Sequence, residues 1–297
     1  MKYLLFDIGS STIKPYLYTG KKLKPLKQTS VHFKKNFTKG NIDSKDKEVL
    51  IKFIESLTKK YPGSIVKTYA TSVFRDIVTH EKAELVEELF SKTKVLLNTI
   101  DQTTESLYLQ MALVDKYKTK TNIFLVNIGG GSTELIVLSN HQSIERKNIK
   151  LGVGTVISNF PTINNEISGV ALSDVTKFIK NKLPKLKNIV DVAFYTGGEL
   201  NYMQLAKYAL RTNNLFNDKE HPSIIKLKDF IDSNGRVFTE VKLKELERLM
   251  PENPKWMRGA RACSALAQAI FQEYKIKTIV PSNSNLIDGV VRYKFGN

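Results

Sequence analysis

Cysteine and histidine are scarce in this sequence, which limits the metal and redox chemistry it can carry. The 297 residues include one cysteine, Cys263, so a disulfide framework and a cysteine-based zinc site are excluded. The four histidines, at positions 32, 80, 141 and 221, lie far apart, and none has the HxxxH or HxH spacing of a histidine metal site. We therefore expect no metal centre built from these two residue types.

Long apolar runs are also missing. No stretch approaches the roughly 18 uncharged apolar residues that cross a membrane. The apolar run at the N-terminus reaches an acidic residue, Asp7, too early for a signal peptide. We therefore expect a cytoplasmic protein without a membrane anchor. Hydrophobic residues still make up 41% of the chain, and its length predicts one large domain or two domains of about 150 residues.

Acidic residues are few relative to basic ones: 29 Asp and Glu against 46 Lys and Arg, a formal net charge of +17. Two interpretations stay open. The 38 lysines form a solvated surface, or they attract an acidic partner such as nucleic acid, a nucleotide or polyphosphate. The lysines between residues 21 and 60 likewise form a solvated face or a basic track for a long polyanion. Aromatic residues suited to stacking on bases are not interleaved with them, which argues against nucleic acid.

Hydrophobic periodicity predicts one arrangement of strands and a helix twice. The first copy has strands at 3–9, 12–19, 23–33 and 64–72 and a helix at 44–60. The second has strands at 123–129, 133–140, 142–150 and 190–196 and a helix at 172–183. Other predicted elements are helices at 80–91, 103–117, 199–211, 239–249 and 257–274 and strands at 94–100 and 277–281. The polar segment 211–237 is predicted to be a long connection.

This repeat predicts an α/β protein of two domains, each a mixed β-sheet with flanking helices, with a cleft between them. The first domain is expected at 1–118, completed by residues 283–297, and the second at 119–282. The junction is predicted near 118–122.

Glycine-rich turns follow three of the predicted strands. Backbone N–H groups in such turns, together with serine and threonine hydroxyls, attract anions, and glycine lets the backbone approach a ligand closely or adopt a positive φ. Two turns occupy the same place in the two repeats, which favours phosphate binding over plain β-hairpins. The third is a wall of the same cleft or a strand-to-helix turn. The candidate phosphate-binding residues are Gly9, Ser10, Ser11, Thr12, Gly129, Gly130, Gly131, Ser132, Thr133, Gly197 and Gly198.

Six segments in order resemble the exopolyphosphatase/guanosine pentaphosphate phosphohydrolase (Ppx/GppA) family, within the actin/Hsp70/sugar-kinase superfold. They are FDIGSSTIK (6–14), ATSVFRD (70–76), TIDQTTESLY (99–108), VNIGGGSTEL (126–135), IKLGVG (149–154) and MRGARACSALAQAI (257–270). The resemblance implies two ribonuclease H-like (actin-like) domains with the active site in the cleft. A basic residue closes the family's first phosphate motif, and Lys14 takes that place here.

The implied activity is removal of the terminal phosphate from inorganic polyphosphate, guanosine pentaphosphate or both, by Mg²⁺-assisted attack of water. Another divalent ion is an alternative to Mg²⁺. The implied partners are polyphosphate or guanosine penta- and tetraphosphate, and a homodimer is expected from the family alone. Longer family members carry an extra C-terminal helical domain, and its absence here is expected to favour short chains or a nucleotide as substrate.

The resemblance also assigns roles to individual side chains. Glu105 matches the catalytic base, and its alternative is a carboxylate on a helix surface. Glu134 matches the carboxylate that holds a divalent cation or the attacking water, and Asp7 matches an aspartate facing Mg²⁺. Arg75 is expected to clamp a phosphate through its fork of donors, with a surface salt bridge as the alternative.

The sequence departs from the family pattern in three places. Asn127 stands where the family has Asp, so a metal ligand is lost or becomes an amide oxygen. Segment 101–106 lacks the family's Ser-Gly and first Glu, and Ile287-Asp288 replaces Arg-Glu in NLIDGVV (285–291). These departures motivate a second hypothesis, a catalytically weak sensor that binds polyphosphate or an alarmone. A third is an ATP-dependent kinase of small molecules from the same superfold.

Overall fold

The computed structural model describes residues 1–113, 122–140, 142–188, 190–215, 219–251 and 253–296. The chain divides into two compact units. Unit 1 comprises Met1–Ala112 and Leu286–Asn297, and unit 2 comprises Leu113–Asn285. The sequence predicted that the first segment of unit 1 ends at residue 118, six residues later than in the structure. It predicted that the C-terminal segment begins at residue 283, three residues earlier than in the structure. Of the predicted junction, residues 118–121 lie outside the described residues.

Unit 1 is built on a mixed sheet in the order β3-β2-β1-β5, with β4 paired to β2. Strand β1 runs antiparallel to β2 and parallel to β5. The strands are β1 (Tyr3–Ile8), β2 (Thr12–Tyr18), β3 (Leu23–Pro25), β4 (Thr29–Ser30) and β5 (Ile65–Ala70). The helices are α1 (Phe33–Asn36), α2 (Ser44–Lys60), α3 (Thr79–Thr93), α4 (Gln102–Leu113) and α11 (Leu286–Phe295), with a 3-10 turn, η1 (Ser72–Arg75).

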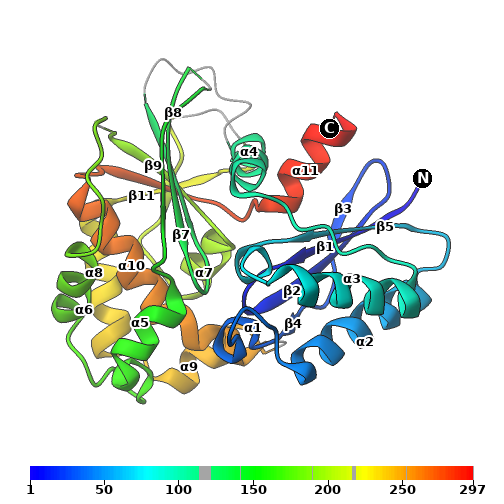
Figure 1. Ribbon diagram of the computed structural model, residues 1–297. Helices are drawn as coiled ribbons and strands as arrows, with labels where there is room; N and C mark the ends of the chain where they lie inside the picture. The colour runs from blue at the N-terminus through cyan, green and yellow to red at the C-terminus, as the bar shows by residue number, and fades with distance from the viewer. Residues whose placement is uncertain (114–121, 141, 189, 216–218, 252, 297) are drawn as a thin grey trace. The chain divides into compact units, whose positions relative to one another are not determined.

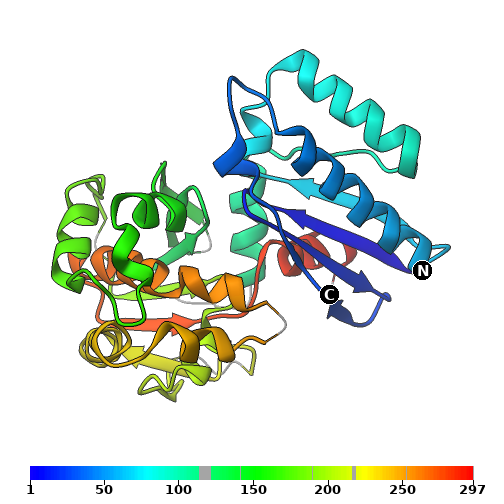
Figure 2. The same cartoon turned by 90° about the horizontal axis from the view of Figure 1, so that it is seen from below.

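Alternation along β1 divides the core of unit 1 into two layers, because successive strand residues point to opposite faces. Leu4, Phe6 and Ile8 pack with the apolar residues of α2 and α3. Leu5 packs on the other face, with α4 and α11. Figures 1 and 2 show α2 and α3 on one side of this sheet and α11 on the other. Asp7 has the parity of Leu5, so its carboxylate lies on the face that α4 covers.

Unit 2 is built on a seven-stranded sheet in the order β10-β11-β12-β9-β6-β7-β8. Helices α5, α6, α8 and α10 pack their apolar residues against this sheet around one large core, and Figure 1 shows them gathered on one side. The strands are β6 (Ile123–Ile128), β7 (Thr133–Ser139), β8 (Gln142–Ile149), β9 (Val192–Thr196), β10 (Arg211–Thr212), β11 (Ser223–Lys226) and β12 (Thr278–Pro281). The helices are α5 (Val153–Asn159), α6 (Leu172–Lys180), α7 (Glu199–Leu205), α8 (Leu227–Thr239), α9 (Leu243–Arg248) and α10 (Ala260–Glu273), with 3-10 turns η2 (Pro161–Asn164) and η3 (Pro254–Gly259).

The predicted repeat is confirmed in the sheets. Strand β6 runs antiparallel to β7 and parallel to β9, as β1 does to β2 and β5. Register is conserved as well, because Asp7 lies opposite Lys14 and Asn127 lies opposite Glu134. The two copies are therefore offset by 120 residues, and each ends its first strand in a glycine turn. This is the mixed-sheet α/β architecture that the sequence predicted.

Five sequence predictions are corrected. Segment 94–100 forms only an isolated bridge between Ala70 and Thr99, because the Thr68 hydroxyl bonds with Leu96 and Asn98 where a ladder would form. The predicted strand 23–33 breaks into β3, β4 and α1. The predicted connection 211–237 contains β10, β11 and most of α8, and the helix expected at 239–249 is the shorter α9. The helix expected at 199–211 ends at Leu205.

Within the described ranges, none of the helices is long and apolar enough to cross a bilayer.

Candidate active site

The turn after β1 places two charged side chains on one face of the unit 1 sheet. The Gly9 N–H donates to the Thr12 carbonyl at 3.0 Å and closes the turn. Asp7 Oδ2 lies 4.0 Å from Lys14 Nζ, and only 14% of the Asp7 side chain is exposed. Burial raises the pKa of Asp7, and the Lys14 charge partly offsets this. The sheet thus holds a carboxylate whose charge is only partly compensated.

Glu105 and Arg75 form a partly buried ion pair in the same unit. Arg75 Nη1 donates to Glu105 Oε2 at 2.7 Å, and the side chains are 21% and 11% exposed. Arg75 comes from η1, which follows β5, and Glu105 from the first turn of α4. Burial raises the pKa of Glu105, the Arg75 charge and hydrogen bond lower it, and the negative charge of Asp7 raises it. Asp7, Arg75 and Glu105 are therefore electrostatically coupled.

Helix α4 holds Glu105 in place through contacts at both of its ends. The Asp101 carboxylate accepts from the Thr104 N–H at 2.9 Å, an N-terminal cap that lowers the pKa of Asp101. Arg292 of α11 donates to the Met111 carbonyl at 3.0 Å near the other end. A Cβ on Gly289 would stand 1.7 Å from the Tyr108 carbonyl oxygen, so only glycine lets α11 approach α4 this closely. The C-terminal helix therefore positions the helix that carries Glu105.

Unit 2 has a different polar group at the equivalent position. Asn127 Nδ2 donates to Glu134 Oε2 at 2.8 Å, and the Ser132 hydroxyl donates to Glu134 Oε1 at 3.0 Å. Glu134 is 3% exposed. In unit 1 the carboxylate stands on the first strand of the hairpin, whereas in unit 2 it stands on the second. Asn127 thus acts as a hydrogen-bond donor that fixes a buried carboxylate.

The glycine turn of unit 2 rests directly on the start of α5. The Gly129 N–H donates to the Ser132 carbonyl at 2.8 Å, and the Val153 N–H donates to the Gly129 carbonyl at 3.0 Å. A Cβ on Gly152 would lie 2.6 Å from the Gly129 oxygen and 2.7 Å from the Ser132 nitrogen. Gly152 therefore allows this close packing. Neither Gly9 nor Gly129 has a positive φ, so their role is close approach rather than left-handed geometry.

Three of the candidate phosphate-binding positions have other structural roles as well. Thr133 is completely buried, and its hydroxyl donates to the Leu151 carbonyl at 2.7 Å. Its side chain is therefore part of the core. Gly197 and Gly198 have φ of +122° and +99° and join β9 to α7, which confirms the predicted strand-to-helix turn. Because Thr196 pairs with Asn127, this turn lies at the same sheet edge as the 129–132 turn.

A family model described as the Ppx/GppA phosphatase family matches residues 20–294. The chain belongs to the Ppx/GppA phosphatase family. Solved structures agree on the fold. The Aquifex aeolicus Ppx/GppA phosphatase is 18% identical with a TM-score of 0.72, covering 98% of each chain. An exopolyphosphatase from Cytophaga hutchinsonii is 15% identical with a TM-score of 0.76, covering 100% of this chain and 98% of its own. No curated protein matches the sequence.

The resemblance to the Ppx/GppA family is thus confirmed, and with it the actin-like fold of two mixed sheets. The structure brings together Asp7, Lys14, Arg75 and Glu105 within unit 1. It brings together Asn127, Ser132 and Glu134 within unit 2. The catalytic, phosphate-binding and metal-binding roles of these residues remain predictions.

The family implies a divalent cation, and the side chains of the described residues fit one mode of holding it. No group of three or more His, Cys, Asp or Glu residues gathers within the described ranges, so a cage made by protein alone is not present there. Mg²⁺ usually binds through one or two carboxylates and completes its shell with substrate phosphates and water. The Asp7 carboxylate fits that mode. Both Glu134 oxygens already accept hydrogen bonds, and Asn127 points its amide N–H₂ at Glu134.

Sequence reasoning missed four residues that position this site: Asp101, Gly152, Gly289 and Arg292. Gly152 lay within the matched segment IKLGVG, and Gly289 lay within NLIDGVV, so a glycine inside a matched motif was the available signal. Asp101 three residues before Thr104 was a readable N-cap. Arg292 gave no local signal, because its partners on α4 lie about 180 residues earlier in the chain.

Proposed function

We propose that this protein hydrolyses the terminal phosphoanhydride bond of linear inorganic polyphosphate, releasing one phosphate at a time. The observation that carries the proposal is the buried Glu105 carboxylate, held by Arg75 beside Asp7. Membership of the Ppx/GppA phosphatase family supports the reaction class and favours it over the small-molecule kinase alternative. Guanosine pentaphosphate is the second candidate substrate, because it ends in the same anhydride.

Glu105 is proposed as the general base. The water oxygen bonds to the terminal phosphorus while Glu105 takes a proton from that water. The bridging P–O bond breaks, and its electron pair leaves with the shortened chain. A general base works best when its pKa lies near the working pH, and burial moves the pKa of Glu105 upward from its ordinary value. Arg75 opposes that rise, and its hydrogen bond fixes the orientation of the carboxylate.

Arg75 is proposed to bind the terminal phosphate of the substrate while it also holds Glu105. Its contacts with Glu105 and with the Ile100 carbonyl both use Nη1. In the proposal, Nη2 and Nε donate to oxygens of the terminal phosphoryl group, the bidentate geometry for which arginine is suited. Lys14 adds a positive charge on the same sheet face. These cations neutralise charge that develops on the phosphoryl oxygens.

The two glycine turns are proposed to bind phosphate through backbone N–H groups. In the first turn, Ser10, Ser11 and Thr12 offer such donors, and the closed Gly9–Thr12 bond fixes the turn's shape. In the second, the bond between Gly129 and Ser132 does the same. We propose Asp7 as the side chain that would hold Mg²⁺, and Mg²⁺, when bound, neutralises phosphate charge.

The test is release of inorganic phosphate from tripolyphosphate, long-chain polyphosphate and guanosine pentaphosphate in parallel, with Mg²⁺ and with a chelator. We expect Mg²⁺-dependent release from polyphosphate. A parallel incubation with ATP and candidate sugars and acids measures phosphorylation of the acceptor. Phosphate release from none of the three substrates contradicts the proposal, and ATP-dependent phosphorylation replaces it with the kinase alternative.

One observation favours a second function, a catalytically weak sensor of polyphosphate or an alarmone. Asn127 replaces the family's aspartate, and its amide occupies one oxygen of Glu134. Both features lower the number of carboxylate oxygens open to a cation in unit 2. The sensor predicts ligand binding by calorimetry without phosphate release from any of the three substrates.

A further inference from the structure

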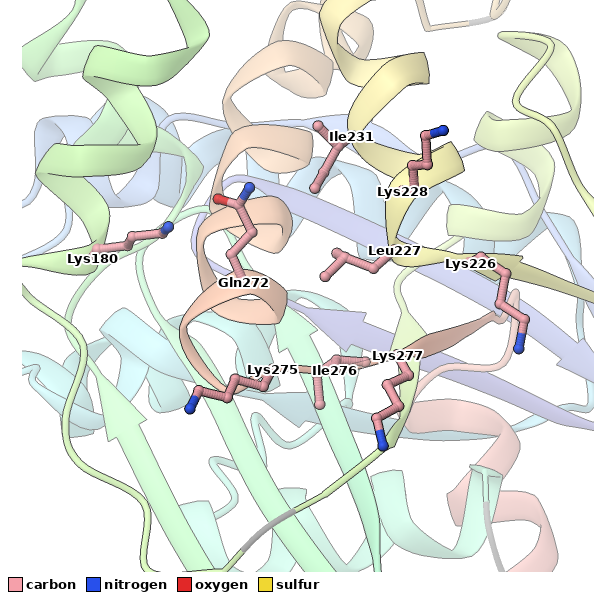
Figure 3. A pocket seen from close by; sticks show the side chains of 9 residues that line it. All are labelled: Lys180, Lys226, Leu227, Lys228, Ile231, Gln272, Lys275, Ile276 and Lys277. Carbon is pink, nitrogen blue, oxygen red and sulfur yellow. The ribbon is translucent and has the colours of Figure 1, made fainter.

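Unit 2 also carries a pocket lined by lysines, away from its glycine turns. An open pocket of about 620 Å³ lies where the end of α6, the β11–α8 junction and the α10–β12 connection meet (Figure 3). Its lining contains five lysines and no acidic residue. The lining residues are Lys180, Lys226, Leu227, Lys228, Ile231, Gln272, Lys275, Ile276 and Lys277.

The fold places these lysines together from segments distant in sequence. Strand β11 pairs with β12 so that Lys226 lies opposite Thr278, and Lys226 Nζ donates to the Thr278 hydroxyl at 2.9 Å. The Leu227 N–H donates to the Lys277 carbonyl at 3.2 Å, which joins the start of α8 to the same edge. Lys275 follows α10 with a φ of +56°, a sharp turn that leaves it exposed. The cluster is therefore built by tertiary structure.

Nearby acidic side chains compensate only part of this charge. Lys277 Nζ lies 3.1 Å from Asp191 Oδ1, and both side chains are largely exposed, at 74% and 59%. Such an exposed ion pair is weak and exchanges readily for another anion. Asp229, in the first turn of α8, is paired with Arg211 at 2.6 Å. The pocket therefore keeps an excess of positive charge.

The arrangement of the ammonium groups selects the shape of the ligand. In Figure 3 Lys226, Lys228 and Lys277 lie on one side of the apolar residues Leu227 and Ile276, and Lys180 and Lys275 lie on the other. The five ammonium groups surround the pocket and do not converge on one point. A single phosphate contacts few of them, whereas a linear polyanion that crosses the pocket contacts several at once.

We propose that this lysine pocket is an accessory binding site for a distal segment of long-chain polyphosphate. The inference rests on the proposed function for its choice of ligand. Polyphosphate carries a negative charge on each phosphate and has no bases. The lining contains no aromatic side chain on which a base could stack, which disfavours single-stranded nucleic acid as the occupant. Bound here, a long chain stays attached to the protein after each release of its terminal phosphate.

The first test measures binding without turnover. In the Glu105→Gln background and with a chelator present, K226Q/K228Q/K275Q/K277Q is compared with its parent for labelled long-chain polyphosphate and for tripolyphosphate. The matched control is K185Q/K187Q/K242Q/K244Q, which removes four exposed charges from the same unit. Each exposed ion pair contributes only a few-fold to affinity, and the variant removes four lysines at once. We therefore expect it to lose about tenfold or more in affinity for the long chain. We expect a smaller salt dependence as well.

The second test measures kinetics in the wild-type background. We expect the pocket variant to raise KM for long-chain polyphosphate about tenfold, leaving kcat and the KM for tripolyphosphate close to those of the control variant. Equal long-chain affinity in the pocket and control variants overturns the inference, as does loss of single-stranded RNA binding with polyphosphate binding intact. Absence of phosphate release by the wild type contradicts the proposed function instead, because the binding experiment does not depend on turnover.

Discussion

Replacing Arg75 with methionine tests how the buried ion pair sets the pKa of Glu105. Methionine keeps much of the side-chain volume and removes the charge. A hydrogen bond to a charged group contributes about 1.5–3 kcal/mol to stability, and one pH unit corresponds to about 1.4 kcal/mol. With both side chains no more than 21% exposed, solvent screens this pair little. We therefore expect the variant to lose an interaction of that size and the pKa of Glu105 to rise further above its ordinary value.

The sign follows from the role of the base. Glu105 must be ionised to accept a proton, so kcat/KM falls as the pH drops through its pKa. Removing Arg75 removes a charge and a hydrogen bond that lower this pKa, while burial and Asp7, which raise it, remain. The acid limb of the pH profile should therefore move to higher pH. Arg75→Lys keeps a cation but loses the fork of donors, and we expect it to shift the limb less.

The assay is kcat/KM for tripolyphosphate as a function of pH in the wild type and both variants. Titration of the substrate is the same in all three, so the difference between profiles reports the protein. The level of activity also falls if Arg75 binds phosphate, so the position of the limb is the quantity compared. An unchanged limb, or a limb moved to lower pH, refutes Glu105 as the base controlled by Arg75.

Three further predictions concern the two turns and the buried carboxylate. Asn127→Asp replaces the donor to Glu134 with a second carboxylate 2.8 Å away, and it should lower the Mg²⁺ concentration needed for half-maximal activity; an identical Mg²⁺ curve shows that the departure is compensated. Gly152→Ala forces a Cβ to 2.6 Å from the Gly129 oxygen and should cost about 1–3 kcal/mol in denaturant unfolding, with loss of activity; full activity refutes its supporting role. Asp7→Asn should abolish activity yet stabilise the fold by up to about 1 kcal/mol at neutral pH. Because burial raises the pKa of Asp7, that gain should vanish below its ordinary value of 3.8, where the wild-type carboxyl is protonated as well; equal stability at both pH values contradicts it.

Local sequence was sufficient where each element carries its own signals. Helix α2 begins and ends at the predicted residues 44 and 60, because the apolar face is regular and Asp43 accepts from the Lys45 N–H. The hairpins β1–β2 and β6–β7 were readable from buried strands interrupted by glycine and serine. The candidate site was found through motifs, and these hold residues that the structure places together, such as Arg75 and Glu105.

Local sequence failed where distant partners decide the structure. Helix α8 contains Ser233, Asn234 and Gly235, which indicate a loop when taken alone. In the fold Asn234 is fully buried and donates to Gln268 at 2.9 Å, while Tyr208 donates to its side-chain oxygen at 2.6 Å. Those bonds satisfy the polar groups that would otherwise oppose a buried helix. The strand predicted at 94–100 does not form for a similar reason. The Thr68 hydroxyl donates to the Leu96 carbonyl and accepts from the Asn98 N–H, so it bonds these two backbone groups in place of a neighbouring strand.

The measurement that tests the central claim most directly compares Glu105→Gln with Glu84→Gln, which changes an exposed carboxylate on α3. Both are assayed for phosphate release from tripolyphosphate in ¹⁸O-labelled water and for binding by calorimetry. We expect Glu105→Gln to bind substrate and to lose about 10²-fold or more in release, while Glu84→Gln and the wild type place ¹⁸O in the released phosphate. Release by Glu105→Gln close to the wild-type rate contradicts the assignment of Glu105 as the base.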